Sequence, residues 1–182
     1  MGDFDQSMRL VFANEGYFSN DPNDRGGPTM WGLSTNFLKS IGDDRDTRSI
    51  LKEEAVEVYR ANFWDPMRGD ELPDPLAAMA FDAAVNHGVS GGTKVLQRAV
   101  VALGGAVGSS GSDGKLGPDT LDGILDAWDR FGLVFAGYVL RGRQDVYDYL
   151  IRRDASQKRF LRGWINRLRR CASFCETGEV QP

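Results

Sequence analysis

Apolar side chains recur every three or four positions along most of the chain, a spacing typical of helices that bury one face. The first such stretch, residues 4–12, predicts a helix that Asp3 or Asp5 caps and that Gly16 ends. If Asp3 is the cap, Gln6 is placed to reach back to it. Alternation typical of strands is nearly absent, so we predict a mainly α fold. The same helical spacing predicts further helices over residues 49–64, 76–87, 93–103, 131–153 and 160–168, and one opened by Pro118.

Two stretches interrupt the helical pattern. Residues 17–34 read YFSNDPNDRGGPTMWGLS, which is turn chemistry and predicts a loop excursion or a short β-hairpin. Residues 104–117 contain six glycines, which predicts a flexible loop. This glycine-rich loop is the best candidate for a boundary between two halves of the chain, and it is equally compatible with an excursion within one compact domain.

Composition places the chain among globular proteins. Its 182 residues are 41% hydrophobic and 26% charged, and no apolar run approaches the ~20 residues that span a bilayer. The chain does not open with a basic segment followed by an apolar one, so we expect no cleavable signal peptide. One His and two Cys disfavour a zinc site, a histidine-rich metal site and a disulfide framework, so we expect no metal.

The net charge of −4 conceals an uneven distribution. Residues 152–170 contain eight basic side chains and one acidic side chain, while the rest of the chain is strongly acidic. A basic C-terminal segment can attract an anionic polymer, or it can be the solvated face of an amphipathic helix. In the predicted last helix, Phe160, Trp164 and Leu168 face inward and the arginines largely face solvent.

Glu15 stands out among the ionisable residues. It follows Phe4 by eleven positions, which places the two only ~20° apart around a helix. Glu15 is therefore predicted to end the buried face of the first helix. Burial disfavours the ionised form of a carboxyl group, and a group that keeps its proton near neutrality suits general acid catalysis. The alternative interpretation is a glutamate at a frayed helix end that points to solvent.

Asp24 and Thr29 follow Glu15 in the same loop-rich stretch. A carboxylate at a helix end and another on a facing loop can flank a polymer chain, as in glycoside hydrolysis, where one protonates the leaving oxygen. The second activates water or stabilises positive charge, and Thr29 could position the water. The alternative for Asp24 is turn chemistry, because the residues around it hydrogen-bond their own backbone.

Three aromatic residues, Tyr17, Phe18 and Trp31, accompany these carboxylates. Aromatic rings beside carboxylates are common in carbohydrate sites, where ring faces pack on sugar faces. Such rings are equally common as a local hydrophobic lid over a core.

Residues 14–34, NEGYFSNDPNDRGGPTMWGLS, resemble the opening motif of glycoside hydrolase family 108, which includes phage-type N-acetylmuramidases and proteins once labelled secretion activators. The chain departs from the motif at Tyr17 and Phe18, where the family usually has Gly and Tyr. This departure removes a tyrosine hydroxyl from one position and adds a bulky ring at the other. The matching positions are Glu15, Gly16, Asp24, Gly26, Gly27, Thr29, Trp31 and Gly32.

The resemblance continues through nearly the whole chain. Residues 63–88 resemble the family's second block, and the stretches LQRAV, DGKLGPDT and KRFLRGWINRLRR resemble the predicted peptidoglycan-binding region at its C-terminus. The resemblance implies a lysozyme-like catalytic region over residues 1–95 and a helical peptidoglycan-binding region over residues 96–182, either separate or packed into one compact domain. The pattern DGxxGPxT, here DGKLGPDT, recurs in several cell-wall-binding modules, and this stretch is equally a turn that precedes a helix at Pro118.

For activity, the resemblance implies a peptidoglycan hydrolase that cleaves the β-1,4 bond between N-acetylmuramic acid and N-acetylglucosamine, without a cofactor. Glu15 matches the family's catalytic glutamate and is expected to be the general acid, with Asp24 and Thr29 as further catalytic residues. For Asn86, the end of a core helix is the alternative to a place in the substrate groove. The residues expected to bind substrate are Tyr17, Asn20, Trp31 and Asn86.

Two other functions are compatible with the sequence. A lytic transglycosylase also uses one glutamate but forms an anhydro-sugar, and a non-catalytic peptidoglycan-binding or secretion-linked module needs no acid. We expect a monomer that binds peptidoglycan, with no nucleic acid and no stable membrane insertion. We expect synthesis in the cytoplasm and action in the periplasm or cell wall, after release through a holin during phage-type lysis or after dedicated export.

Overall fold

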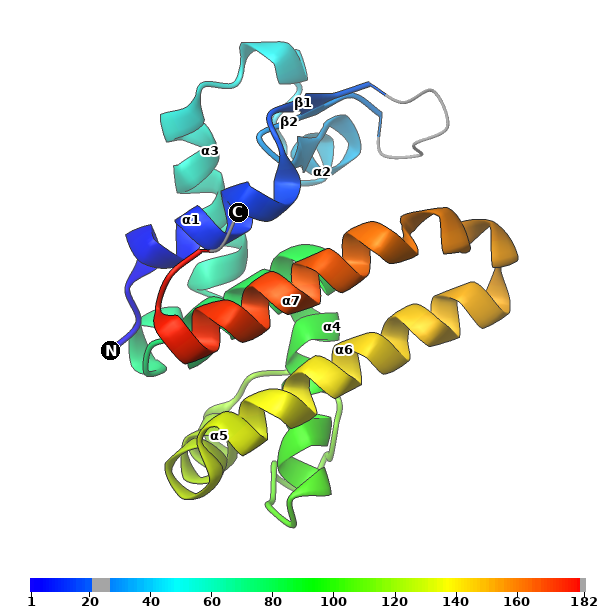
Figure 1. The fold of residues 1–182 in the computed structure, drawn as a ribbon. Helices are drawn as coiled ribbons and strands as arrows, with labels where there is room; N and C mark the ends of the chain where they lie inside the picture. Colours follow the sequence, from blue (N-terminus) through cyan, green and yellow to red (C-terminus); the bar gives the residue numbers. More distant parts are fainter. Residues whose placement is uncertain (21–26, 181–182) are drawn as a thin grey trace.

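The computed structural model describes residues 1–20 and 27–180 (Figure 1). Within these ranges every predicted helix has a counterpart, and the mainly α fold is confirmed. The α-helices are α1 (Phe4–Glu15), α2 (Thr35–Ser40), α3 (Lys52–Tyr59), α4 (Leu76–Ala102), α5 (Pro118–Phe131), α6 (Leu133–Arg153) and α7 (Leu161–Thr177). Shorter helical turns are η1 (Thr47–Ser49), η2 (Arg60–Trp64), η3 (Gly69–Glu71) and η4 (Ala155–Phe160).

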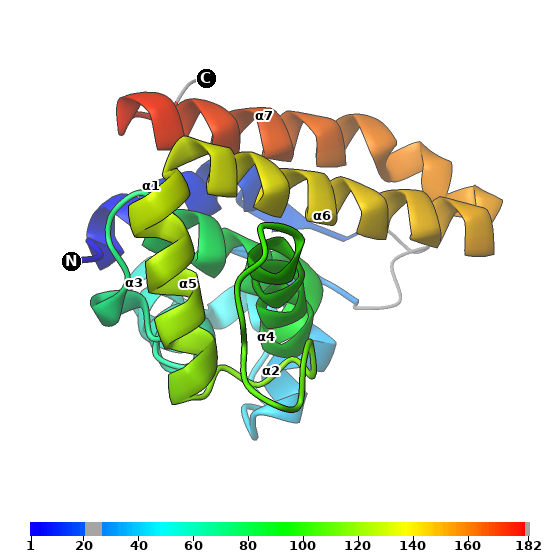
Figure 2. The same ribbon diagram turned by 90° about the horizontal axis from the view of Figure 1, so that it is seen from below.

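Helix α4 lies at the centre of the molecule, where it contacts α1, α5, α6 and α7. Residues 76–84 of α4 are all buried, as expected for a helix surrounded by others. Figure 1 shows α6 and α7 side by side and running in opposite directions, and Figure 2 shows α4 nearly end-on with α5 beside it. The two C-terminal helices therefore pack on the same central helix as α1.

Helix α1 begins where the sequence predicts, with Asp3 as its cap. The Asp3 carboxylate accepts a hydrogen bond from the Gln6 backbone N–H at 2.9 Å. The expectation that the Gln6 side chain reaches back to Asp3 is wrong. That side chain donates to the Gly178 carbonyl oxygen at 2.8 Å, so it fastens the end of the chain to the first helix.

The two helices predicted on either side of residue 88 lie end to end in α4. Gly88 has φ 73° and ψ 158°, a non-helical conformation that ends the first helix as predicted and kinks α4 at this residue. Helix α5 begins at Pro118, as predicted. The glycine-rich loop between α4 and α5 is fastened by the buried Gln97, whose amide oxygen accepts from the Gly114 backbone N–H at 2.8 Å and whose amide nitrogen donates to Asp113 at 3.0 Å. The glycine content predicts a flexible loop but does not reveal the Gln97 contacts that hold it.

The described part of residues 17–34 contains the predicted hairpin excursion. Strands β1 (Phe18–Ser19), β2 (Thr29–Met30) and β3 (Leu33–Ser34) form an antiparallel sheet in that order. Trp31 and Gly32 join β2 to β3, with φ values of 54° and 83°. A two-residue turn with positive φ at both positions is type I′, which matches the twist of a hairpin and favours glycine.

The prediction that Phe160 faces inward is wrong, because its side chain is 40% exposed. The arginines of the C-terminal segment largely face solvent, as predicted, but Arg167 of α7 is buried. The physical reason is a carboxylate on α4, Asp82, which is fully buried and needs a positive partner. Across the described ranges, no helix is both long and apolar enough to cross a membrane.

Candidate active site

Glu15 is the last residue of α1, and its side chain lines a cavity of about 390 Å³. The side chain is 20% exposed, in agreement with its predicted place at the end of the buried face. The size lies within the range of sites that bind small molecules or chain segments. The walls come from the hairpin, from α2, from α3 with η2, and from the kink in α4, and they include Gly32, Ser34, Tyr59, Asn62, Phe63 and Gly88.

The hairpin approaches Glu15 so closely that only glycine fits at position 32. A Cβ atom on Gly32 would come within 2.7 Å of the Glu15 Cβ and would overlap the Tyr59 hydroxyl. Tyr59 is buried and donates to the Trp31 carbonyl oxygen at 3.0 Å, which fixes the turn beside Glu15. Burial, and then the negative charge of Glu15, raise the pKa of Tyr59, so it is a neutral donor.

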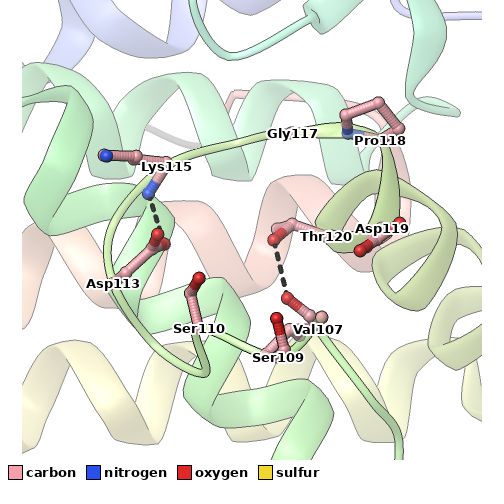
Figure 3. A pocket seen from close by; sticks show the side chains of 10 residues that line it. Val107, Ser109, Ser110, Asp113, Lys115, Gly117, Pro118, Asp119 and Thr120 are labelled. Atoms are coloured by element: carbon pink, nitrogen blue, oxygen red, sulfur yellow. Dashed lines mark hydrogen bonds between the residues drawn. The ribbon is translucent and has the colours of Figure 1, made fainter.

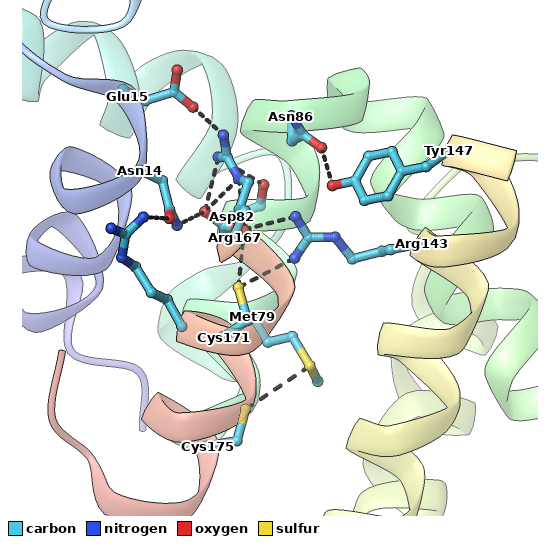
Figure 4. Close-up of polar contacts among 11 residues, drawn as sticks. Asn14, Glu15, Met79, Asp82, Asn86, Arg143, Tyr147, Arg167, Cys171 and Cys175 are labelled. Carbon is cyan, nitrogen blue, oxygen red and sulfur yellow. Dashed lines mark hydrogen bonds and ion pairs between the residues drawn. The ribbon is translucent and has the colours of Figure 1, made fainter. Parts of the chain in front are cut away.

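Arg167 of α7 forms an ion pair with Glu15. Its Nη1 lies 2.5 Å from Glu15 Oε1, although the two residues are 152 positions apart in the chain. Arg167 also donates through Nε to both carboxylate oxygens of Asp82, at 3.1 and 3.0 Å (Figure 4). Arg167 therefore joins Glu15 to the buried centre of the molecule.

Asp82 is the centre of this buried polar network. Arg143 of α6 donates to it at 2.8 Å, the Cys171 thiol at 3.1 Å, and the Asn14 amide at 3.0 Å. Burial alone would raise the pKa of Asp82, but the charges of Arg167 and Arg143 outweigh it and hold this pKa below its usual range. The negative charges of Glu15 and Asp82 balance the positive charges of Arg143 and Arg167. Because the charges are paired, the network is tolerated in the interior.

The other predicted catalytic residues lie outside the cavity lining or outside the description. Thr29 lies in β2, partly buried, and its hydroxyl donates to the Gly27 carbonyl oxygen at 3.3 Å. Thr29 is not among the described residues that line the Glu15 cavity. Asp24 lies outside the described residues, and its role remains a prediction.

The expected aromatic binding residues pack against each other in the hairpin. The rings of Tyr17 and Trp31 meet edge to face, with centroids 4.6 Å apart, and Tyr17 is exposed. Trp31 also packs on Phe12 and donates through Nε1 to the Ile50 carbonyl oxygen at 3.1 Å. Asn20 is exposed just after β1. Trp31 thus helps to hold the hairpin, and both the sugar-binding and the lid interpretation stay open for this group.

Asn86 lies on α4, two residues before the kink. Its amide oxygen accepts a hydrogen bond from the Tyr147 hydroxyl at 2.6 Å, and its side chain lines a second cavity that also contains Arg167. The next residue, His87, packs against the Tyr147 ring with centroids 5.3 Å apart. Burial, and then the charges of Arg143 and Arg167, lower the pKa of His87 to about 3, so it is neutral near pH 7.

Sequence reasoning missed Asp82, Arg143 and Arg167. Each is a charged residue on an otherwise apolar helical stripe, and that is the signal that could have found them. Asp82 stands within AAMAFDAAV, and Arg143 follows Val139 by four positions and precedes Tyr147 by four. A charge at such a position must be paired, but the pattern does not identify its partner.

The DGKLGPDT stretch borders a separate cavity of about 270 Å³ in the C-terminal half (Figure 3). The Asp113 carboxylate accepts from the Lys115 backbone N–H at 2.9 Å, and the Thr120 hydroxyl donates to the Val107 carbonyl oxygen at 3.3 Å. These contacts shape the loop that leads into Pro118, as the structural interpretation of this stretch predicts.

Comparison with known proteins agrees with this arrangement. Residues 8–88 match the family model described as Glycosyl hydrolase 108, and residues 91–169 match the model described as Predicted Peptidoglycan domain. The chain is also similar to the solved structure of Brucella abortus SagA, with 26% sequence identity and a TM-score of 0.76, over 95% of this chain and 93% of that one. None of the curated proteins matches the chain.

The two family matches meet at the kink in α4 and together span most of the sequence. The first contains Glu15 and the hairpin, and the second contains Arg143 and Arg167. A peptidoglycan-related second half also agrees with action at the cell wall. The N-terminal part of the chain is thus similar to the glycosyl hydrolase 108 family and its C-terminal part to the predicted peptidoglycan domain, which together support a peptidoglycan hydrolase with a lysozyme-like helical fold.

Proposed function

We propose that the protein is an N-acetylmuramidase that cleaves the β-1,4 bond between N-acetylmuramic acid and N-acetylglucosamine, with Glu15 as the general acid. The observation that carries this proposal is the place of Glu15, partly buried in the wall of a cavity of about 390 Å³ and held by Arg167. A carboxylic acid fixed in such a wall can reach a glycosidic oxygen of a bound chain.

The two oxygens of Glu15 have different surroundings. Oε1 is bound by Arg167, while Oε2 has no hydrogen-bond partner within the described ranges. We infer that Arg167 anchors Oε1 and that Oε2, after taking up a proton from solvent, donates that proton to the leaving oxygen. As the bond breaks, the sugar gains oxocarbenium character, and the carboxylate left on Glu15 stays paired with Arg167.

The second carboxylate of the reaction is Asp24 in this proposal, with Thr29 positioning the attacking water. Both follow from the motif that contains Glu15, and hydrolysis needs a group on the far side of the sugar to activate water or stabilise the cation. Tyr17, Asn20, Trp31 and Asn86 are the proposed substrate contacts. The glycan would then lie between the end of α1 and the hairpin.

We further infer that both halves act as one compact catalytic unit, since Arg167 belongs to the second half. The proposed site of action is the periplasm or cell wall, reached through a phage-type lysis holin or by dedicated export. Co-transcription with a holin gene would support the lysis route, and a neighbouring secretion operon would support the other.

The direct test is the release of reducing ends from purified peptidoglycan by the wild type and by Glu15→Gln. Glutamine keeps the size of the side chain and cannot donate the proton, so we expect the rate to fall by about a hundredfold or more. Glu57→Gln is the matched control, because Glu57 is an exposed glutamate on α3.

The products distinguish the alternatives. Reducing N-acetylmuramic acid ends identify a muramidase, whereas 1,6-anhydro ends, detected by mass spectrometry, identify a lytic transglycosylase. Undiminished activity in Glu15→Gln would overturn the assignment of the acid. Binding to peptidoglycan with no released ends in the wild type would overturn the muramidase proposal.

A further inference from the structure

Arg167 lines a second cavity, of about 380 Å³, that borders the Glu15 site. Its walls come from the end of α1, from α4, from η4 and from α7. Figure 4 shows Asn14 and Arg167 meeting at Asp82, while the Asn86 amide points to Tyr147. We call this space the arginine cavity, and the lining residues on which the inference rests are Asn14, Asn86, Arg159, Trp164, Arg167 and Arg170.

The arginine cavity is positively charged. Three arginines line it, and none of its described lining residues is acidic. Arg167 is already paired with Glu15 and Asp82. Arg170 donates to the Asn14 amide oxygen at 3.3 Å, and no ion pair joins Arg159 or Arg170 to any residue in the described ranges. Two guanidinium groups are therefore available to an anion, and guanidinium binds carboxylates through paired hydrogen bonds.

Aromatic rings and amides complete the walls. The rings of Trp164 and Tyr147 stack, with centroids 4.7 Å apart and an interplanar angle of 9°. The ring centroids of Phe160 and Trp164 are 5.9 Å apart. The Asn86 amide oxygen is occupied by the Tyr147 hydroxyl, which fixes that amide at the cavity wall. Rings of this kind pack on sugar or peptide surfaces, and fixed amides hydrogen-bond to amide groups of a ligand.

Peptidoglycan offers an anion of this kind next to the bond that the enzyme cleaves. Its N-acetylated sugars carry no charge, and its carboxylates lie on the peptide stem attached to muramic acid. Building on the proposed function, we propose that the arginine cavity binds a carboxylate of the peptide stem carried by the muramic acid beside the scissile bond. Arg159 and Arg170 supply the charge, and Trp164 and Asn86 contact the neighbouring amide groups.

The test compares two substrates. The kcat/KM for release of reducing ends is measured on glycan strands that keep their peptide stems and on the same strands whose stem carboxylates have been converted to methylamides. We expect the wild type to prefer strands with free stem carboxylates, and the Arg159→Gln/Arg170→Gln variant to lower this preference about tenfold. The control is Arg162→Gln, an exposed arginine of α7 outside the cavity lining, which should change the preference less than about twofold. An unchanged preference in the double variant, or an equal loss in the control, would overturn the inference.

A binding measurement separates this inference from the proposed function. The Glu15→Gln protein is titrated by calorimetry with a soluble disaccharide that carries a tetrapeptide stem and with the same compound whose stem carboxylates are converted to methylamides. We expect about tenfold tighter binding with the free carboxylates, lost when Arg159 and Arg170 are also replaced by Gln. Equal affinity for both ligands contradicts the stem site whether or not the enzyme is active. Failure of the wild type to cleave either strand contradicts only the proposed function.

Discussion

Asp82 holds a negative charge in the interior, where two arginines neutralise it. Replacing it by asparagine leaves Arg143 and Arg167 without their shared partner, so we expect Asp82→Asn to lower the free energy of unfolding by about 3–5 kcal/mol. Urea denaturation measures this change. The control is Asp126→Asn, which breaks an exposed pair with Arg130 on one face of α5 and should cost less than about 1 kcal/mol. Equal effects of the two substitutions would contradict the role of burial.

His87, the one histidine of the chain, gives stability a pH dependence of known sign. Its pKa is lowered from 6.5 to about 3, so below pH 6.5 the unfolded chain binds a proton that the folded protein does not. The free energy of unfolding should therefore fall as the pH falls, by about 2 kcal/mol between pH 7.5 and pH 5. The measurement is urea denaturation across this range.

The matched variant is His87→Gln, which cannot titrate between pH 7.5 and pH 5. Its stability should be nearly constant in that interval, whatever its absolute value. The lowered pKa of Asp82 affects stability only at lower pH, near and below the ordinary range of an aspartate, so it does not confuse the result. A slope in His87→Gln as steep as in the wild type would show that another group is responsible.

Single residues of the candidate site were predictable only where local pattern fixes their surroundings. Glu15 ends the apolar face of a helix whose period is visible in the sequence, and its partial burial follows. Its partner Arg167 resembles any other arginine of a basic segment until α7 is packed against α1. The sequence therefore predicts that Arg167 faces solvent like its neighbours, because the helical period does not show which distant carboxylate pairs with which arginine.

Helices were predictable because the signals that start and stop them are local. Asp3, Gly16 and Pro118 each act within one turn of the chain, and the helix ends that they mark are confirmed. Gly88 is also such a signal, because the first segment of α4 ends there in a non-helical conformation. The close succession of the two segments was not predictable, since residues 89–92 are already helical and the apolar period indicates a helix only from residue 93.

The kink in α4 depends on a backbone conformation that favours glycine. Gly88 has φ 73° and ψ 158°, and no atom lies within 4 Å of an added Cβ, so the cost of Gly88→Ala is conformational rather than steric. We expect it to lower the free energy of unfolding by about 1–3 kcal/mol and to reduce activity, because Gly88 lines the Glu15 cavity. Thermal unfolding and reducing-end assays measure the two effects.

Gly137 is the control for this substitution. It is an exposed glycine within α6, also with open space around an added Cβ, and its φ is not positive. Gly137→Ala should raise the free energy of unfolding by up to about 1 kcal/mol, since alanine favours the helix. A gain of stability in Gly88→Ala as well would show that the kink relaxes without cost.

The two halves of the chain share one interior. Leu10 of α1 and Ala78 of α4 are buried in a cluster with Cys171 and Phe174 of α7, and Gln6 binds the carbonyl of Gly178. We therefore expect the whole chain to unfold in one transition, with coincident curves from far-UV circular dichroism and tryptophan fluorescence. A fragment of residues 1–95 should show no cooperative transition. Two resolved transitions, or a cooperatively folded fragment, would support separate domains instead.

The arginine that anchors Glu15 has a consequence for enzyme engineering. The family models divide the sequence near residue 90, which suggests that the C-terminal half could be exchanged to redirect the enzyme to another cell wall. A chimera joined there keeps Glu15 and Asp82 but takes its guanidinium groups from the donor. Unless the donor presents an arginine against each carboxylate, we expect the graft to leave Glu15 and Asp82 without their ion-pair partners. We expect the same constraint on exchange of the two halves by recombination, because these ion pairs cross the boundary between them.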